Sequence, residues 1–351
     1  MMGGDSNMSS IMSQSNPVVH IPLYSYDGAY DAVVRYMVQQ LLACLASYFA
    51  HENTYDVLIT TNDWRILEVM IDYQAKTRYR FDLRLVSRDE LRRAFHTDDS
   101  RLSDMTCMRT TFSKFFPIMT RQCDAILHLD CDTIFLRKVD LSPLFATAIG
   151  LVDGNQFGRG TLWRPTASQA EFLGIDETVK PRARWLNSGV FAVQGSGFEL
   201  CRREVIHYLE NLERAKADRL IHGNSDELIM NALALKEGKA ITVLSDYTYN
   251  FVAYYLKYDP AWTQNAQIVH FHSLKPDAYW YSDGAVSHDT DETQAERFGD
   301  DFYLAALMWF RHLHTACNGL RFEFPMCSAM PLEVVEKELA TRRHQKHKYI
   351  S

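Results

Sequence analysis

The sequence predicts an α/β protein built on a mostly parallel sheet with helices on both faces. Short apolar and β-branched runs alternate with segments of helical periodicity along the first half of the chain. Hydrophobic residues make up 47% of the chain, which is enough for a large buried core. The length of 351 residues leaves room for one large domain with an extension, or for two modest domains.

The first half of the chain should supply four strands separated by helices. The segment Tyr30–Phe49 has apolar residues at helical spacing but also carries Asp31 and Arg35. It is therefore too polar to span a bilayer, and we expect a core-facing amphipathic helix. A further helix is expected within 104–120, up to or around Pro117. The four strands are expected at Val18–Tyr24, Asp56–Thr60, Leu83–Val86 and Ala125–Leu129.

The second half is less regular. Glycines and prolines predict a loop-rich stretch over 154–184. Beyond residue 280 an acidic loop is followed by an apolar-aromatic helix at 301–317 and a polar helix that ends in a basic run. Between these segments, strands are expected at Leu186–Val193, Ala240–Leu244 and Gln267–His272, and helices at 196–214 and 225–237.

Charge and cysteine content narrow the classes of function. A formal net charge of −7 argues against general affinity for nucleic acid, which needs clustered lysine and arginine. The seven cysteines include no Cys-x-x-Cys pair, which favours reduced thiols and a cytoplasmic location. Residues 1–16 lack the basic and apolar regions of a signal peptide and are expected to be a flexible leader. The basic run near the C-terminus favours a solvated helix end, with contact to a membrane surface as the alternative.

The most informative motif follows the fourth strand, where Asp130-Cys131-Asp132 ends an apolar run. Side chains alternate along a strand, so Asp130 and Asp132 should point to the same side. Two carboxylates held that close repel each other unless a cation lies between them or one is protonated. Hard divalent ions such as Mn²⁺ or Mg²⁺ bind carboxylate oxygens and leave positions open for phosphate. The motif lies at the carboxyl end of a strand, where ligands bind on parallel sheets.

Five segments in register then resemble a known family. Their order along the chain is similar to that in glycosyltransferase family 8, which includes glycogenin-like and bacterial galactosyltransferases. Members of this family have the GT-A fold, a Rossmann-like architecture. The resemblance covers about residues 17–280 and implies a GT-A domain there, with 281–351 as a helical C-terminal extension. The segments are Pro22–Tyr30, Thr111–Thr133, Leu186–Phe191, Ser225–Asn231 and Ile268–Pro276.

The resemblance implies a metal site made of two carboxylates and one imidazole. Asp130 and Asp132 match the family's acidic motif, and a histidine from Ile268–Pro276 matches its third ligand. This loop is one residue shorter than the family's and lacks its glycine, so His270 and His272 both remain candidates. A packed strand histidine is the structural alternative. Such a ligand set suits Mn²⁺.

The resemblance also implies a set of residues that bind a nucleotide-sugar donor. Tyr30 corresponds to the tyrosine that stacks on uracil, with Ser25 and Asp27 near the base and ribose. Lys114 corresponds to a lysine that helps to hold the donor, and Lys275 to one that contacts the diphosphate. Taken alone, Lys114 would be an ordinary helix-surface lysine and Tyr30 a packing residue.

The sugar site is where this chain departs from the family pattern. Asn187-Ser188-Gly189 resembles the family's Asn-Ala-Gly segment, where glycine admits the ligand, although glycine also marks strand bulges. Family 8 usually has Asp-Gln-Asp where this chain has Asp226-Glu227-Leu228. Asp-Glu instead resembles family 6, in which the glutamate faces the anomeric carbon. The same acids also suit the first turn of a helix.

The function implied is a retaining, metal-dependent glycosyltransferase. It would move a hexose or pentose from a nucleotide-diphosphate sugar, with UDP favoured, to a sugar or other hydroxyl acceptor. Glu227 or Asp226 would act on the sugar, as a stabilising charge or as a nucleophile. The alternatives are a phosphatase of the haloacid-dehalogenase type, which also places Asp-x-Asp after an apolar strand, and a non-catalytic protein that binds a sugar nucleotide.

Overall fold

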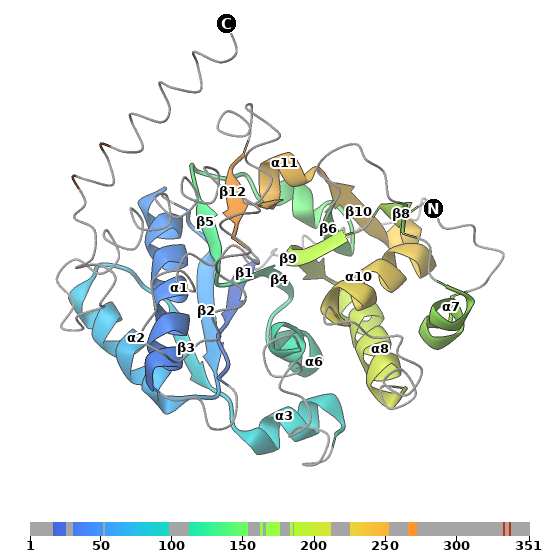
Figure 1. The fold of residues 1–351 in the computed structure, drawn as a ribbon, viewed down its shortest axis with the longest axis horizontal. Helices are drawn as coiled ribbons and strands as arrows, with labels where there is room; N and C mark the ends of the chain where they lie inside the picture. The colour runs from blue at the N-terminus through green and yellow to red at the C-terminus, as the bar shows by residue number, and fades with distance from the viewer. Residues whose placement is uncertain are drawn as a thin grey trace, which may run out of the picture.

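The computed structural model describes a seven-stranded sheet with helices on both faces (Figure 1). The residues described are 17–25, 31–51, 53–97, 112–153, 162–163, 166–175, 183–184, 186–211, 225–252 and 266–271, together with Glu333 and Lys337. The leader 1–16 and the predicted elements after residue 280 therefore lie outside the described residues, apart from Glu333 and Lys337.

The strands of the large sheet run in the order β10-β6-β9-β4-β1-β2-β3. Strand β9 is antiparallel to both of its neighbours, and the other neighbouring pairs are parallel. The predicted fold class, a mixed and mostly parallel sheet flanked by helices, is confirmed. The strands are β1 (Val18–Pro22), β2 (Asp56–Thr61), β3 (Asp82–Leu85), β4 (Ala125–Leu129), β6 (Ile149–Asp153), β9 (Leu186–Gln194) and β10 (Ile241–Leu244).

Two smaller sheets accompany the large one. The first has the order β11-β12-β5, in which β12 pairs antiparallel with β5, and the second is the pair β7-β8. Their strands are β5 (Thr133–Phe135), β7 (Leu162–Trp163), β8 (Ala183–Arg184), β11 (Phe251–Val252) and β12 (Ile268–His270). Since only three residues separate the end of β4 from the start of β5, the β5-β12 pair lies directly beyond the carboxyl end of a central strand.

The helices cover the sheet from two sides. In Figure 1, α1 and α2 lie together on one side, whereas α3, α6, α8 and α10 lie on the other. The helices are α1 (Asp31–Ala50), α2 (Trp64–Lys76), α3 (Arg88–Phe95), α6 (Phe116–Thr120), α7 (Ala167–Leu173), α8 (Gly197–Glu210), α10 (Ser225–Lys236) and α11 (Asp246–Tyr249). Short 3₁₀ turns are found at Ser113–Phe115, Ser142–Phe145 and Gly238–Ala240.

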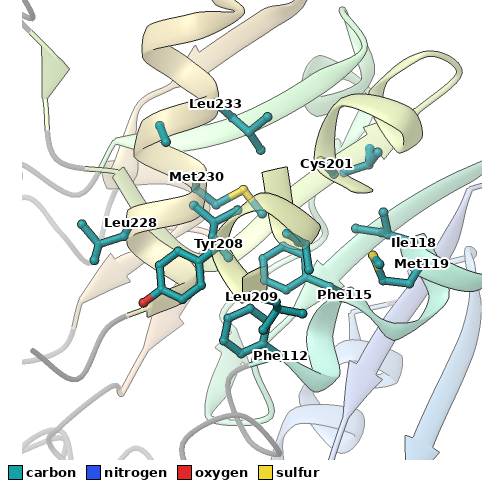
Figure 2. Close-up of a cluster of buried hydrophobic side chains, with 14 of the residues drawn as sticks. Phe112, Phe115, Ile118, Met119, Cys201, Tyr208, Leu209, Leu228, Met230 and Leu233 are labelled. Carbon is teal, nitrogen blue, oxygen red and sulfur yellow. The ribbon is translucent and has the colours of Figure 1, made fainter. Parts of the chain in front are cut away.

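Each face of the sheet has its own hydrophobic core. Alternation along β4 sends Ile126 to the core beneath α6, α8 and α10, and Leu127 and Leu129 to the core beneath α1 and α2. Figure 2 shows the first of these cores, where Phe115 lies among side chains of α8 and α10 such as Tyr208 and Met230. This packing anchors the segment before α6 and the start of α10 against the same face of the sheet.

Most predicted elements are present with boundaries shifted by a few residues. The first strand ends at Pro22 rather than Tyr24, and the described part of 104–120 is the turn Ser113–Phe115 followed by α6. The prediction of a loop-rich segment at 154–184 missed α7. This helix begins at a capping box made by Thr166 and Gln169, a recognisable start signal.

Two further features bear on the predictions from composition. In the described part of the chain, no helix combines the length and the apolar character needed to cross a bilayer. The cysteines whose structure is described, Cys44, Cys123, Cys131 and Cys201, are free thiols.

Candidate functional site

The acidic motif forms a turn between β4 and β5 rather than the continuation of a strand. β4 ends at Leu129, and both the backbone N–H and the hydroxyl of Thr133 donate to the carbonyl of Asp130, at 3.2 and 2.8 Å. The prediction that strand alternation aligns Asp130 with Asp132 is therefore wrong, because the chain turns within the motif. The turn nevertheless directs both carboxylates toward one histidine.

That histidine is His270, the last residue of β12. The antiparallel pairing of β12 with β5 sets His270 opposite Thr133, and the N–H of Phe271 donates to the carbonyl of Asp132 at 2.9 Å. His270 Nε2 lies 3.2 Å from Asp132 Oδ1 and 3.6 Å from Asp130 Oδ2. The other candidate histidine, His272, lies outside the described residues.

The donor atoms of Asp130, Asp132 and His270 fit a divalent cation. One ligand atom from each residue lies within 4.8 Å of the other two. For metal–ligand bonds of about 2.1 Å, adjacent ligand atoms of an octahedral ion are roughly 3 Å apart, close to the separations found here. Burial acts to lower the pKa of His270, but the charge and hydrogen bond of Asp132 outweigh it and raise that pKa. The imidazole thus stands in a strongly negative environment, which also attracts a metal ion.

The absence of a side chain at Gly189 leaves room for the His270 ring. A Cβ atom at position 189 would lie 2.5 Å from His270 Nδ1, closer than any real contact, so a side chain there would displace the ring. Gly189 also accepts a hydrogen bond from the N–H of Asp130 at 2.8 Å. The pairing of β9 with β6 shifts register opposite Leu151 and Val152, so a bulge lies here as well.

Lys114 is a buried cation at the centre of the site, not a surface residue. The turn Ser113–Phe115 carries it, and its ammonium lies 3.1 Å from Asp130 Oδ1 and forms an ion pair with Asp226. Only 4% of its side chain is exposed, so these carboxylates supply most of its stabilisation. Burial alone would lower its pKa, but the charges of Asp130 and Asp226 raise that pKa above the ordinary value.

Helix α10 presents two buried carboxylates from its first turn. Asp226 accepts hydrogen bonds from Lys114 and from the hydroxyl of Ser188. Glu227 Oε1 accepts a hydrogen bond from the side-chain amide of Asn187 at 3.0 Å. Acids in the first turn of a helix are favoured by its dipole, so the structural role and a role toward a ligand coexist. The two acids are thereby assigned different partners: Asp226 faces the lysine, and Glu227 faces an amide.

The side chain of Asn231 joins α10 to the first residue of β9. The side chain of Asn231 accepts from the N–H of Leu186 at 3.0 Å and donates to the carbonyl of the same residue at 3.1 Å. It is fully buried and also donates to the carbonyl of Glu227. The first turn of α10 therefore has a fixed position relative to Asn187 and Ser188.

Sequence reasoning missed two polar residues that complete the site. His128 Nε2 lies 2.8 Å from Asp130 Oδ1, and Asn250 donates from its amide to Asn187 Oδ1 at 2.6 Å. A histidine two residues before Asp130 in an otherwise apolar strand was a usable signal, because strand alternation puts both on one side. Asn250 lies just after α11 and carried no such signal.

Of the remaining residues predicted to bind the sugar-nucleotide donor, the structure describes only Ser25. Ser25 lies just beyond the carboxyl end of β1, where its hydroxyl donates to Asp63 and its N–H to the side chain of Asn62, both at 2.8 Å. Asp27, Tyr30 and Lys275 lie outside the described residues.

Comparisons with known proteins find similarity at the level of structure. No protein-family model matches the sequence, and no curated protein matches it. Among solved structures, galactosyltransferase LgtC in complex with donor and acceptor sugar analogues matches with a TM-score of 0.47 and 15% identity, over 82% of this chain and 95% of that one. Mouse xyloside xylosyltransferase 1 matches with a TM-score of 0.47 and 12% identity, over 75% of this chain and 99% of that one.

The glycosyltransferase GlyE of Streptococcus pneumoniae TIGR4 matches with a TM-score of 0.44 and 15% identity, over 84% of this chain and 63% of that one. These three solved structures are glycosyltransferases. All three likenesses are distant.

Proposed function

We propose that this protein is a retaining glycosyltransferase that uses a nucleotide-diphosphate sugar, with UDP favoured, and a divalent cation. The observation that carries the proposal is the convergence of Asp130, Asp132 and His270 beside a second acidic pair, with buried Lys114 joining the two halves. The first half suits a cation and a diphosphate, and the second suits a sugar.

Asp130, Asp132 and His270 would hold the ion, Mn²⁺ or Mg²⁺. When bound, such an ion acts as a Lewis acid that polarises a phosphate oxygen and stabilises charge on the departing diphosphate. Lys114 would add a fixed positive charge next to the same group, because it already lies against Asp130. Lys275 is proposed as a further contact to the diphosphate, and Ser25, Asp27 and Tyr30 as contacts to the nucleoside.

The sugar would lie against Asn187, Ser188 and the first turn of α10. As the bond from the anomeric carbon to the diphosphate breaks, positive charge develops on the ring, and a nearby carboxylate stabilises it or attacks it. Glu227 is the better candidate of the two acids. Its neighbour Asp226 is engaged with Lys114 and Ser188, whereas Glu227 accepts a hydrogen bond from the side-chain amide of Asn187, in the segment against which the sugar would lie.

The acceptor hydroxyl would approach on the face from which the diphosphate departs, so that the anomeric configuration is retained. Its proton can pass to a phosphate oxygen of the leaving group, which becomes more basic as the bond breaks. No separate general base is needed, and none is assigned among the described residues.

The experiment that tests this function uses the full chain and a panel of UDP-, GDP- and ADP-sugars with Mn²⁺. In the absence of acceptor, we expect slow release of free nucleotide from a UDP-sugar, abolished by EDTA and by Asp132→Asn. If no nucleotide sugar is hydrolysed while p-nitrophenyl phosphate is, the phosphatase alternative holds. If the chain binds UDP but turns over no donor, it is a binding protein.

A further inference from the structure

His128 is a buried histidine that reaches the acidic turn from within the sheet. It lies in the middle of β4, is 0% exposed, and its ring packs 4.7 Å from that of Phe191 on β9. Its Nε2 lies 2.8 Å from Asp130 Oδ1. Because an ionised carboxylate only accepts hydrogen bonds, the imidazole must donate through its Nε2–H.

The two oxygens of Asp130 have different partners. Oδ1 receives the His128 Nε2–H at 2.8 Å and the Lys114 ammonium at 3.1 Å. Oδ2 is the oxygen on the side of His270, at 3.6 Å from its Nε2. Partial rotation of this carboxylate about its terminal bond would turn Oδ2 away from His270, and the hydrogen bond from His128 to Oδ1 opposes that rotation.

Lys114 is less suited to fixing this orientation. Its ammonium is a point charge on a flexible side chain and can donate hydrogen bonds in many directions. It is also shared with Asp226. The imidazole of His128, in contrast, projects from a central strand and is held by the ring of Phe191. Hydrogen bonds to ligating groups commonly set the orientation of those groups and affect metal affinity.

We propose that His128 is a positioning residue that fixes the Asp130 carboxylate so that Oδ2 is presented to the divalent cation. This inference rests on the proposed function, since it assumes that Asp130 is a metal ligand. It goes further by assigning the strength of cation binding in part to a residue that touches neither cation nor substrate.

The chain supplies a matched control in His20. This residue is also 0% exposed, lies opposite His128 on the neighbouring strand β1, and has its ring 5.9 Å away. Its Nε2 forms a hydrogen bond with the hydroxyl of Thr60 at 2.8 Å rather than with a carboxylate. Replacing either histidine disturbs the same core, but only one replacement removes a hydrogen bond to Asp130.

The test measures Mn²⁺ binding by isothermal titration calorimetry on the full chain without any sugar nucleotide. His128→Phe keeps an aromatic ring beside Phe191 and removes the donor, so we expect the Kd for Mn²⁺ to rise about tenfold or more. His128→Gln can return an N–H near the position of Nε2 and should stay within about threefold of the parent. His20→Phe should leave the Kd unchanged within about twofold, with thermal midpoints recorded for all variants.

The outcomes separate this inference from the proposed function. If the parent chain does not bind Mn²⁺, the metal site itself is rejected. If the parent binds and a folded His128→Phe binds equally well, the role of His128 is rejected and the metal site stands. If His20→Phe weakens binding as much as His128→Phe, the effect belongs to core packing and the inference is overturned.

A second measurement needs only the parent chain and His128→Gln, so it holds if His128→Phe does not fold. In protein labelled with ¹⁵N-histidine, the Nε2–H signal that is missing in His128→Gln is assigned to His128. We expect this signal to shift when diamagnetic Mg²⁺ saturates the site, because the cation draws charge from the carboxylate that accepts the hydrogen bond. A signal that does not move on Mg²⁺ saturation would overturn the inference.

Discussion

The His270 ring lies so close to Gly189 that residue 189 has no room for a side chain. A Cβ atom at Gly189 would lie 2.5 Å from Nδ1 of His270, and the ring is buried against the strand. The glycine was expected to make room for a ligand. In the structure it makes room for a proposed metal ligand instead, and it links β9 to the acidic turn through the N–H of Asp130.

Gly189→Ala is therefore expected to displace His270 and to weaken Mn²⁺ binding by at least about tenfold. Gly238→Ala is the matched control, because nothing lies within 4 Å of a Cβ built at that position. Calorimetry with Mn²⁺ measures both variants. Equal affinities for the two would show that the ring moves without leaving the site.

Lys114 pairs with the partly exposed Asp130 and with the buried Asp226, so its loss should destabilise the fold as well as reduce the activity. Breaking a buried ion pair by removing one partner typically costs about 3–5 kcal/mol, because the remaining charge has no partner. We expect Lys114→Met to lower the free energy of unfolding by about this amount. In the double variant Lys114→Met/Asp226→Asn, much of this stability should return, while turnover of donor should not.

Urea unfolding of the two single variants and the double variant completes the cycle. Additive losses of stability would mean that Lys114 and Asp226 do not interact energetically, against the ion pair described above. Recovery of turnover in the double variant would mean that the lysine serves only the fold.

The two acids of α10 should respond differently to loss of charge. Glu227→Gln keeps an oxygen that accepts from Asn187, so the fold is retained, and kcat should fall by about tenfold or more, or about 1.4 kcal/mol of transition-state stabilisation. Asp226→Asn should mainly lower stability, because it leaves the Lys114 charge with one fewer partner. Steady-state kinetics and thermal midpoints of the two variants test this difference. Unaltered kinetics in Glu227→Gln would exclude an essential carboxylate at position 227.

The free energy of unfolding should decrease as the pH falls, because two histidines are buried in the sheet. Burial, together with His128, holds the pKa of His20 well below its ordinary value, and burial lowers the pKa of His128 to about 4. Below about pH 6.5 the unfolded chain therefore binds protons that the folded chain does not, so protonation favours unfolding. Each such histidine contributes a slope of up to about 1.4 kcal/mol per pH unit.

This stability is fully present above about pH 6.5 and is lost as the pH falls toward the folded-state pKa values. We expect His20→Phe to show a shallower decline in the free energy of unfolding between about pH 6.5 and 5 than the parent chain. Urea titrations at several pH values measure the slopes. Parallel curves for the two proteins would contradict a neutral, buried His20.

Asp132→Asn should reduce turnover by at least about a hundredfold, comparable to removing a main stabiliser of developing charge. The thermal midpoint should stay nearly unchanged, since the asparagine oxygen can still accept from His270, which lies 3.2 Å from Asp132 Oδ1. Intact turnover in this variant, insensitive to EDTA, would reject the metal site.

The sequence was informative where a short local pattern determines structure. The apolar run before Asp130 predicted a buried strand with acids at its carboxyl end, and the acids after Ser225 predicted a helix start; both elements are present. The convergence of Asp130 with His270 depends on the pairing of β5 with β12, which strand periodicity cannot specify. The resemblance supplied that pairing indirectly, through the position of the histidine in its motif.

Burial was the property least accessible from the sequence. The local pattern does not distinguish Lys114 from a surface lysine, because its partners, Asp130 and Asp226, come from distant segments, and only the resemblance assigns it to the donor site. The strand argument for aligning Asp130 with Asp132 failed because Thr133 stabilises a turn at that point. The Thr133 hydroxyl donates to a backbone carbonyl three residues earlier, a local bond of the kind that competes with strand pairing.

The most direct measurement is a crystal structure of the full chain with Mn²⁺ and UDP. It should show the ion about 2.0–2.4 Å from one oxygen of Asp130, one oxygen of Asp132 and a nitrogen of His270, and in contact with the diphosphate. A diphosphate bound elsewhere, or an ion that leaves Asp130 and Asp132 paired only with Lys114 and His270, would contradict the account.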